Sequence, residues 1–161
     1  MDFPFNFIII PVLIIALAYY NRGFVRKGLK TWYKDLKKPQ WAPRGSILRE
    51  MWFFLYVITG LAVMWYWNVP ARNWLQYVVG GILLANAYLY MTWNKQFFAD
   101  NNLKASAKTI LRAFVVLVVA VLLMVKDSPI AVFLMMPYLA WLGVAYKMNK
   151  EIINLNKVQE K

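Results

Sequence analysis

The sequence contains no cysteine and no histidine, and only 7 of its 161 residues are acidic. Without cysteine the chain can form no disulfide, no thiolate metal site and no thioether bond to haem. Without histidine it also lacks the commonest ligand of zinc and of haem iron. These absences predict that the protein holds no metal, and they leave its redox compartment open.

The acidic residues are also badly placed for catalysis. They lie in expected loops, tails or helix ends, and none sits in the middle of an apolar run, where a proton relay would need one. The acidic residues are Asp2, Asp35, Glu50, Asp100, Asp127, Glu151 and Glu160. The chain shows no paired carboxylates, no glycine-rich phosphate loop and no nucleophile with a base, so ordinary hydrolytic or metal catalysis is not predicted.

Apolar residues dominate the chain. Hydrophobic residues make up 61% of it, aromatic residues 17%, and the mean hydropathy is +0.46, whereas soluble domains average roughly 45–50% apolar residues. We therefore predict a single integral membrane domain over residues 1–161. The first apolar run resembles a signal peptide in place only: its one early charge is Asp2 and no cleavage pattern follows, so we expect a spanning helix.

The predicted fold class is all-α, an integral membrane bundle of five transmembrane helices. A helix needs about 20 apolar residues to cross about 30 Å of hydrocarbon. The predicted helices cover residues 3–20, 47–67, 74–93, 106–125 and 129–146. Only the connector at 21–46 is long enough to fold over the bundle as a lid. Five unequal spans contain no inverted repeat, which disfavours an alternating-access transporter.

The basic residues predict the orientation in the membrane. Five crossings place the termini on opposite sides, and 17 of the 19 Lys and Arg residues then share one side, with only Arg72 and Lys126 opposite. The positive-inside bias puts the lid loop and the C-terminus in the cytoplasm and the N-terminus outside. Because the cations flank apolar spans, where anionic lipid explains them, the net charge of +12 does not predict nucleic-acid binding.

The connector carries the pattern WYKDLKKPQWAP at residues 32–43. Pro39 and Pro43 fix backbone angles and remove two N–H donors, so this stretch is expected to be rigid and non-helical, with Trp41 presented between them. A plain connector is the alternative reading. A loop of about 25 residues is long for a compact domain, which favours a functional lid.

Several motifs in order along the chain resemble the TspO/MBR family, the tryptophan-rich sensory proteins and translocator proteins, also called peripheral-type benzodiazepine receptors. Residues 32–43 resemble its first-loop pattern. Trp52, Leu55, Tyr56 and Gly60 resemble its second-helix pattern W-x-x-L-Y-x-x-x-G. The segment PYLAWL at 137–142 resembles its last-helix Pro-Tyr-x-x-Trp element, followed at matching spacing by Asn149, Ile152, Leu155 and Asn156.

This resemblance implies a five-helix bundle, often a homodimer, whose first loop closes a pocket that binds porphyrins and, in some members, cholesterol or synthetic ligands. It implies a porphyrin ligand such as protoporphyrin IX or haem, and no cofactor that the protein requires. The residues expected to bind the ligand are Trp32, Pro39, Trp41, Pro43, Trp52, Tyr56, Trp93, Arg112, Pro137, Tyr138, Trp141 and Asn149.

The middle of the chain departs from the family pattern. Tyr90 stands where the family usually has Asn, Thr109 where an Asp is common, and Arg44 where a second Pro is usual. Asn94 and Lys95 likewise replace prolines. These changes bear on ligand identity more than on fold, and Asn86, one turn before Tyr90, could supply a similar amide.

Tryptophan and arginine each allow two interpretations. Indole rings suit a flat conjugated ligand, but tryptophans also anchor helices at membrane interfaces, which is the expected role of Trp65, Trp67 and Trp74. Arg112 falls on one helix face with Lys104 and Lys108 and lies one to two turns inside its span. It could pair with a ligand carboxylate or phosphate, or it could extend to the headgroups.

Together these features predict a membrane protein that binds a hydrophobic tetrapyrrole or related lipid-like ligand in a tryptophan-lined, cytoplasm-facing pocket. Its output could be sensing, buffering or transport. The alternatives are a light- or oxygen-dependent porphyrin-degrading enzyme that uses Trp32 and Trp141, which the family resemblance implies, or a sterol or lipid translocator.

Overall fold

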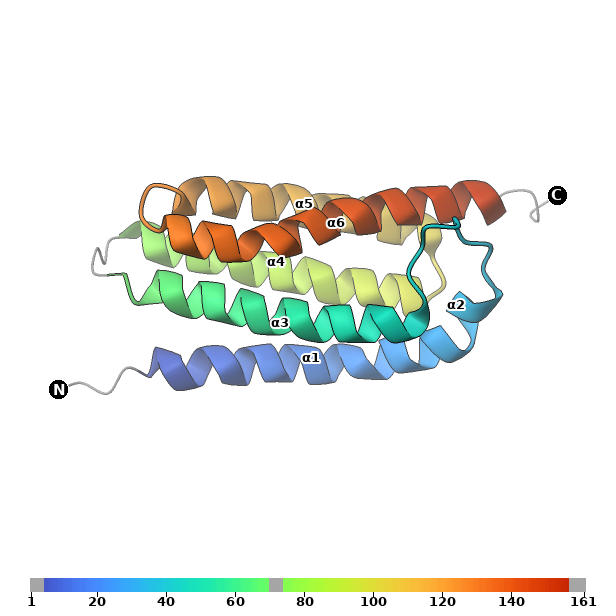
Figure 1. The fold of residues 1–161 in the computed structure, drawn as a ribbon, viewed down its shortest axis with the longest axis horizontal. Coiled ribbons are helices and arrows are strands. Elements are labelled where there is room, and N and C mark those ends of the chain that lie inside the picture. Colours follow the sequence, from blue (N-terminus) through green and yellow to red (C-terminus); the bar gives the residue numbers. More distant parts are fainter. Residues whose placement is uncertain (1–4, 70–73, 157–161) are drawn as a thin grey trace.

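The structure is a computed structural model that describes residues 5–69 and 74–156. The described residues form six helices and no strand (Figure 1), which confirms the all-α fold class. The helices are α1 (Asn6–Lys30), α2 (Trp32–Asp35), α3 (Gly45–Trp67), α4 (Trp74–Phe98), α5 (Leu103–Met124) and α6 (Pro129–Asn156). The expected count of five is therefore not what the structure shows, because the four-residue α2 forms inside the predicted lid.

Four of the helices, α1, α3, α5 and α6, are long and apolar enough to cross a membrane. Helix α4 has 25 residues, the same length as α1. It does not meet the same hydropathy criterion, since Gln76, Asn86 and Asn94 interrupt its apolar sequence, and all three of these side chains are buried. Their burial indicates that the polar face of α4 is turned into the bundle.

The five long helices form a ring. Helix α1 packs against α3 and α4, α3 against α6, α6 against α5, and α5 against α4. The backbones of α3 and α4, although consecutive in the chain, seldom come close among the described residues, and side chains such as Trp52 and Tyr90 bridge the distance between them. The ring is therefore tightly packed along α4, α5 and α6 and loose where α1, α3 and α4 meet.

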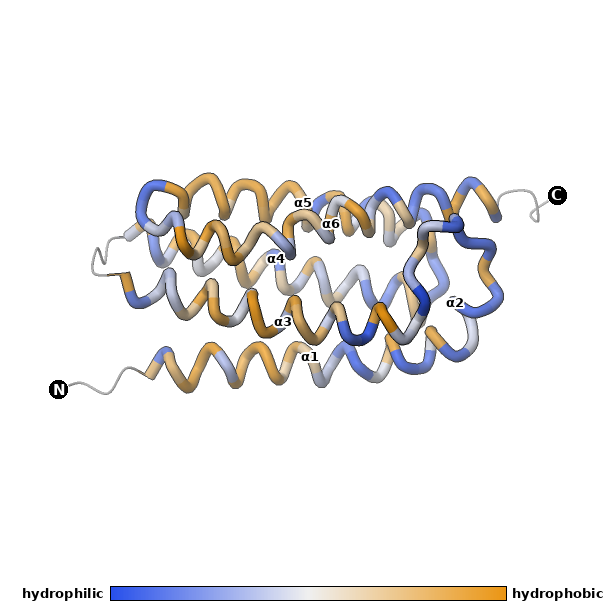
Figure 2. The backbone as a smooth tube through the Cα atoms, viewed as in Figure 1, coloured by the Kyte–Doolittle hydropathy of each residue, from blue (hydrophilic) through white to orange (hydrophobic). Residues whose placement is uncertain are grey.

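The two ends of the bundle differ in polarity. Helix α1 begins at one end, and α6 ends at the other end beside α2 and the lid loop (Figure 1). Hydrophilic residues gather at this lid end, and apolar residues fill the middle (Figure 2). An odd number of crossings requires this placement of the chain ends, and the cytoplasmic assignment of the lid end stays a prediction from charge.

The first and last long helices extend further than their apolar runs. Helix α1 continues from residue 20 to Lys30, and α6 from residue 146 to Asn156. A prediction from hydropathy ends the helix where the apolar residues end. Lys, Arg and Glu have high helix propensity, so the helix continues beyond the membrane core into water. The non-helical lid therefore shrinks from the predicted 21–46 to residues 36–44, apart from the single residue Thr31. Predicted helical residues 3 and 4 lie outside the described part.

The other helix bounds move less. Helix α3 begins two residues before the predicted 47, α4 continues from 93 to Phe98, and α5 runs from Leu103 to Met124. Asn101, between α4 and α5, has a positive φ of 53°, a conformation that Asn tolerates well. The side chain of Asn102 then caps α5 by accepting a 2.9 Å hydrogen bond from the Ala105 N–H.

At the lid end, α1 and α4 approach each other closely at Gly28. A Cβ atom placed on Gly28 would lie 2.6 Å from the Cβ of Phe98 and 2.7 Å from its backbone oxygen. Only glycine permits this approach, since the contacted atoms include backbone that cannot rotate away. Gly28 therefore fixes α1 against α4 at one end of their length.

Candidate functional site

Beneath the lid, aromatic side chains from α3, α4 and α6 pack into one cluster around Trp52. The ring of Trp52 lies 4.9 Å from Tyr90, 5.8 Å from Trp141 and 5.9 Å from Trp93, measured between ring centroids. Trp93 continues the cluster to Phe97 and Phe98, and Tyr33 of α2 packs on both phenylalanines. Trp52, Trp93 and Trp141, three of the residues expected to bind a ligand, therefore pack against one another in the structure.

The lid is joined to the last turns of α6 at two points. Asn156 accepts a hydrogen bond from the Lys37 N–H (3.2 Å) and donates one to the Lys37 carbonyl (2.9 Å). Trp41 donates its indole N–H to a Glu151 carboxylate oxygen at 2.9 Å, and Lys147 lies over the Trp41 ring. The part of α6 that the hydropathy pattern did not predict is thus the part that holds the lid.

Lys38 stabilises the short helix α2 from its C-terminal side. Its ammonium donates to the backbone oxygens of Tyr33, Lys34 and Leu36 and sits 4.7 Å from the Tyr33 ring centroid. Burial lowers the pKa of Lys38, and the nearby Asp35 raises it in part. A cation at a helix C-terminus satisfies carbonyl groups that have no partner within the helix.

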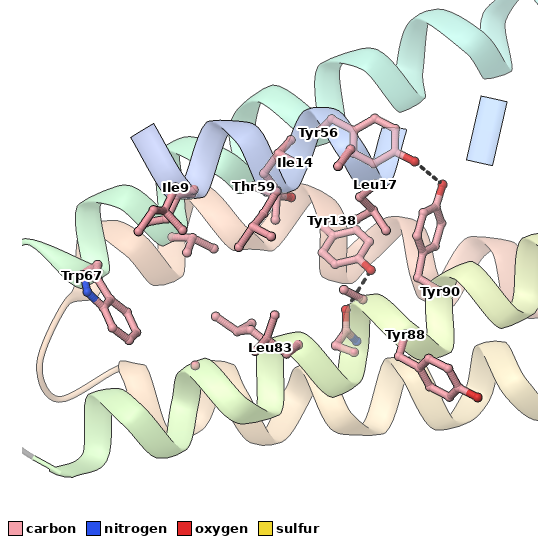
Figure 3. Close-up of a pocket in the computed structure, with 18 of the residues that line it drawn as sticks. Ile9, Ile14, Leu17, Tyr56, Thr59, Trp67, Leu83, Tyr88, Tyr90 and Tyr138 are labelled. Atoms are coloured by element: carbon pink, nitrogen blue, oxygen red, sulfur yellow. Dashed lines mark hydrogen bonds between the residues drawn. The ribbon is translucent and has the colours of Figure 1, made fainter. Parts of the chain in front are cut away.

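A cavity of about 1360 Å³ lies on the other side of the aromatic cluster, in the half of the bundle away from the lid. Its walls come from α1 between Asn6 and Tyr20, from α3 between Trp52 and Trp67, and from most of α4, with Tyr138 of α6 also in contact. Figure 3 shows Ile9, Ile14 and Leu17 of α1 facing Leu83 of α4 across this space. The cavity forms where the backbones of α3 and α4 lie apart.

Two hydrogen-bonded pairs form the inner wall of the cavity (Figure 3). Tyr56 donates to the Tyr90 hydroxyl at 3.2 Å. Tyr138 donates to the Asn86 side-chain oxygen at 2.9 Å, and the Asn86 amide donates to the Ala113 carbonyl at 2.7 Å. These polar groups mostly satisfy one another, which leaves an aromatic surface facing the cavity.

The end of the cavity away from the lid is closed by α3 and α4 side chains. The Trp67 ring packs edge-on against Tyr77 at 5.9 Å. Gln76 donates to the Tyr66 carbonyl at 3.2 Å, so its amide also turns toward backbone. At the same end the Asn6 amide donates to the Asn68 side-chain oxygen at 2.8 Å, which ties α1 to α3.

The predicted ligand-binding residues fall into three groups in space. Trp52, Tyr56 and Tyr138 line the cavity. Trp93 and Trp141 are buried on the far side of Trp52 from the cavity, within the cluster. The lid and α2 hold the half-buried Trp32, Pro39 and Pro43 and the exposed Trp41.

The remaining predicted residues lie outside the cavity. Arg112 is exposed on the outside of α5, as are Lys104 and Lys108. Pro137 is half-buried within α6, one residue before Tyr138. Asn149 is buried and donates to the Ser106 hydroxyl at 2.9 Å, which joins α6 to α5. Of these residues, Asn149 has a packing role in the structure, because its hydrogen bond joins two helices.

Sequence reasoning missed the contribution of α1 entirely. Asn6 and seven further residues of α1 between Ile9 and Tyr20 line the cavity, yet this helix carries none of the recognised motifs. The sequence also could not show that Tyr90 pairs with Tyr56. A signal was present in α4, where Tyr77, Gly81, Leu84 and Tyr88 recur at helical spacing on one face.

Three indole N–H groups beneath the lid have no hydrogen-bond partner in the structure. They belong to Trp32, Trp93 and Trp141, and each nitrogen is buried. Shape and ring contacts therefore hold the cluster. Within residues 5–69 and 74–156, no group of three Asp or Glu side chains is arranged to hold a metal ion.

A model of the TspO/MBR family matches residues 7–155 of the chain. The protein belongs to the TspO/MBR family. The motifs in the lid loop, α3 and α6 are therefore those of true relatives, and the resemblance drawn from them is confirmed. Its apolar helices and this membership make it a membrane protein.

Relatives of this TspO/MBR member occur in bacteria, archaea and mammals. It is 27% identical to tryptophan-rich protein TspO of Chlorobaculum tepidum over 89% of this chain and 91% of the relative. It is 24% identical to tryptophan-rich protein TspO of Archaeoglobus fulgidus, over 89% of this chain and 92% of the relative. It is 29% identical to the translocator protein of Bos taurus, over 88% of this chain and 82% of the relative.

Proposed function

We propose that this protein binds a hydrophobic tetrapyrrole or related lipid-like ligand within the membrane, in the cavity between α1, α3 and α4. The cavity itself is the observation that carries the proposal. At about 1360 Å³ it exceeds the roughly 300–1,000 Å³ of ordinary ligand pockets. A bundle of this size does not usually leave such a space unfilled, because packing stabilises it.

The surface of the cavity suits a flat, conjugated ligand. Trp52, Tyr56, Tyr90 and Tyr138 form its inner wall, and aliphatic residues of α1 form the opposite wall. A planar ring system gains from such aromatic faces beyond the burial of its area. The aliphatic wall would cover its other face.

The position of the site supports a role inside the bilayer. The cavity lies along the apolar half of the bundle, and four of the helices meet the length and hydropathy of membrane spans. We propose that α4 is the fifth span, because it is as long as α1 and its polar residues Gln76, Asn86 and Asn94 are buried against protein. Five crossings would place the two chain ends on opposite sides of the membrane, and the basic residues at the lid end would then put that end in the cytoplasm.

The name of the mammalian relatives, translocator protein, fits movement of a ligand. The relatives in Chlorobaculum tepidum and Archaeoglobus fulgidus are named tryptophan-rich proteins. Sensing, buffering and transport each require the bound state proposed here. Binding is therefore the step to test first.

The test uses two alanines of α4 that lie two residues apart. Ala87 lines the cavity, whereas Ala85 is exposed and does not. A porphyrin titrated into the full chain in lipid nanodiscs should bind saturably at one site per chain, read from porphyrin absorbance and tryptophan quenching. Ala87→Trp should weaken binding at least tenfold because the indole fills the cavity, and Ala85→Trp should leave it unchanged.

Two results would reject the proposal. One is the absence of saturable binding to the unmodified protein. The other is equal binding to the Ala87→Trp and Ala85→Trp proteins when both retain the helical circular-dichroism spectrum of the unmodified chain, since that would place the porphyrin elsewhere.

A further inference from the structure

Three cations follow one exposed face of α5, starting near its first turn. Lys104, Lys108 and Arg112 recur every four residues, and all three are exposed on the outside of the bundle. The same face continues with exposed aliphatic side chains, namely Val115, Val119 and Leu122. From the lid end inward, this face therefore changes from cationic to apolar, in the order in which a phospholipid changes from headgroup to acyl chain.

Two hydrogen bonds to neighbouring helices show how deep these cations lie. Asn149 of α6, three residues beyond the end of the apolar run of that helix, donates to Ser106. Thr109 donates to the side-chain oxygen of Gln96, which follows the exposed Lys95 of α4. On both neighbouring helices the apolar sequence thus ends about level with Thr109. The first two cations of the α5 face, at 104 and 108, therefore lie at the level of the headgroups.

Arg112 is the deepest of the three cations. It lies three residues beyond Thr109, which is about 4.5 Å further into the bundle along the helix axis. From this depth the arginine side chain can extend back to the phosphate level while its aliphatic stem stays among acyl chains. Lys108 lies one turn before it on the same face. The two cations can therefore approach the same phosphate.

The helices that pack against α5 offer Arg112 no free carboxylate. Helices α4 and α5 contain no Asp or Glu. Glu151 is the one acidic residue of α6, and it accepts from the Trp41 indole and pairs with Lys147. A cation at this depth needs a partner, because water is scarce there. The bilayer itself can supply that partner as a lipid phosphate.

We propose that Lys108 and Arg112 bind the phosphate of an anionic phospholipid, with Lys104 beside the rest of the headgroup and the aliphatic face of α5 against an acyl chain. A guanidinium and a phosphate form paired, charge-assisted hydrogen bonds. Three cations without a neighbouring acid favour a headgroup of net negative charge over one that carries an ammonium group. No residue of α5 lines the cavity, so this site is independent of the proposed function.

The first arm of the test measures lipid binding to the full chain by native mass spectrometry. Phosphatidylglycerol and phosphatidylcholine with the same acyl chains are added in detergent. Each cation near the membrane surface favours an anionic lipid by about fivefold, so the first phosphatidylglycerol should bind at least tenfold more tightly than phosphatidylcholine. The double variant Lys108→Gln and Arg112→Gln should lose this preference. Equal binding of the two lipids to the unmodified chain would overturn the proposal.

A matched double variant on α1 controls for net charge. Arg26 and Lys30 are also an exposed arginine and lysine four residues apart near the lid end, but they lie beyond the apolar run of their helix. Arg26→Gln with Lys30→Gln removes the same charge and should leave the preference for phosphatidylglycerol within about twofold of the unmodified value. An equal loss in both double variants would mean diffuse attraction by the net charge of +12 and would overturn the site on α5.

The second arm needs no variant. A phosphatidylglycerol that carries a diazirine in its acyl chain is cross-linked to the unmodified protein in nanodiscs, and the labelled peptides are identified by mass spectrometry. Labelling should concentrate within residues 111–122 and be competed by unlabelled phosphatidylglycerol more than by phosphatidylcholine. Labelling spread evenly over the exposed apolar faces of α1, α3 and α5, or competed equally by both lipids, would overturn the proposal.

Discussion

The two halves of this bundle use the same five long helices but pack them differently. At the lid end, Gly28 brings α1 against α4, and Trp52, Trp93 and Trp141 fill the space between α3, α4 and α6. At the other end, Asn6 of α1 is hydrogen-bonded to Asn68, the backbones of α3 and α4 lie apart, and a cavity remains between the three helices. The cluster of Trp52, Trp93 and Trp141 therefore fills the half of the bundle near the lid, and the ligand site proposed here lies next to this cluster.

The difference also separates stability from function. The lid end is held by close packing, by two links from the lid to α6 and by Lys38 on α2. The cavity end has interhelical hydrogen bonds of its own, among them Tyr56–Tyr90 and Tyr138–Asn86, but it carries more exposed apolar side chains. Substitutions at the lid end should change the free energy of unfolding, and substitutions around the cavity should change ligand binding.

The largest expected effect comes from exchanging glycine for alanine in each half. Gly28→Ala should destabilise the protein by about 3 kcal/mol, the upper part of the usual range for overpacking, because its methyl group meets the backbone of Phe98. Gly81→Ala should not destabilise it, since its methyl group meets open space. Thermal unfolding in detergent, followed by circular dichroism, checks both. Equal stability of the two variants would mean that α1 and α4 are not in close contact at the lid end.

An intermediate effect is expected at the boundary between the halves. Tyr138→Phe removes the donor to Asn86 and leaves a buried amide oxygen without its partner, at a cost of about 1 to 2 kcal/mol. Tyr88→Phe, at an exposed position on α4, should cost almost nothing. Chemical or thermal unfolding compares the two. If they match, the Tyr138–Asn86 hydrogen bond does not stabilise the fold.

The smallest effect is expected at the lid. Asn156→Ala removes both hydrogen bonds to Lys37, which are partly exposed, so the loss should be about 1 kcal/mol. Hydrogen exchange at residues 36–44 should accelerate several-fold, while porphyrin binding stays unchanged because no residue of the lid lines the cavity. Asn68→Ala removes an amide contact at the opposite end and should not alter exchange in the lid. Weaker porphyrin binding by the Asn156→Ala protein would mean that the lid contributes to binding in the cavity.

The sequence predicted the parts of the fold that depend on composition and local pattern. Apolar runs located the long helices, and Pro39 and Pro43 located the non-helical lid. The extensions of α1 to Lys30 and α6 to Asn156 were missed because hydropathy records the membrane core and does not record helix length. The short α2 was missed because Lys38, which stabilises it, acts through carbonyl contacts that no periodicity reveals.

The location of the cavity was beyond sequence reasoning for a different reason. Trp52, Tyr56 and Tyr138 were predicted to bind ligand and do line it. Their partners Trp93 and Trp141 were predicted with them, but they lie on the filled side of Trp52. Trp52 borders the cavity on one side and packs against tryptophans on the other. Which side faces the cavity depends on the distance between α3 and α4, and that distance cannot be derived from the residue types.

The central claim is that the ligand lies between α1, α3 and α4 and not beneath the lid. Photo-cross-linking with a diazirine-bearing porphyrin ester, followed by mass spectrometry of the peptides, tests it most directly. The account predicts labelled residues within 9–20 and 77–91, with labelling competed by unmodified ester. Competed labelling confined to residues 32–43 and 141–149 would contradict it.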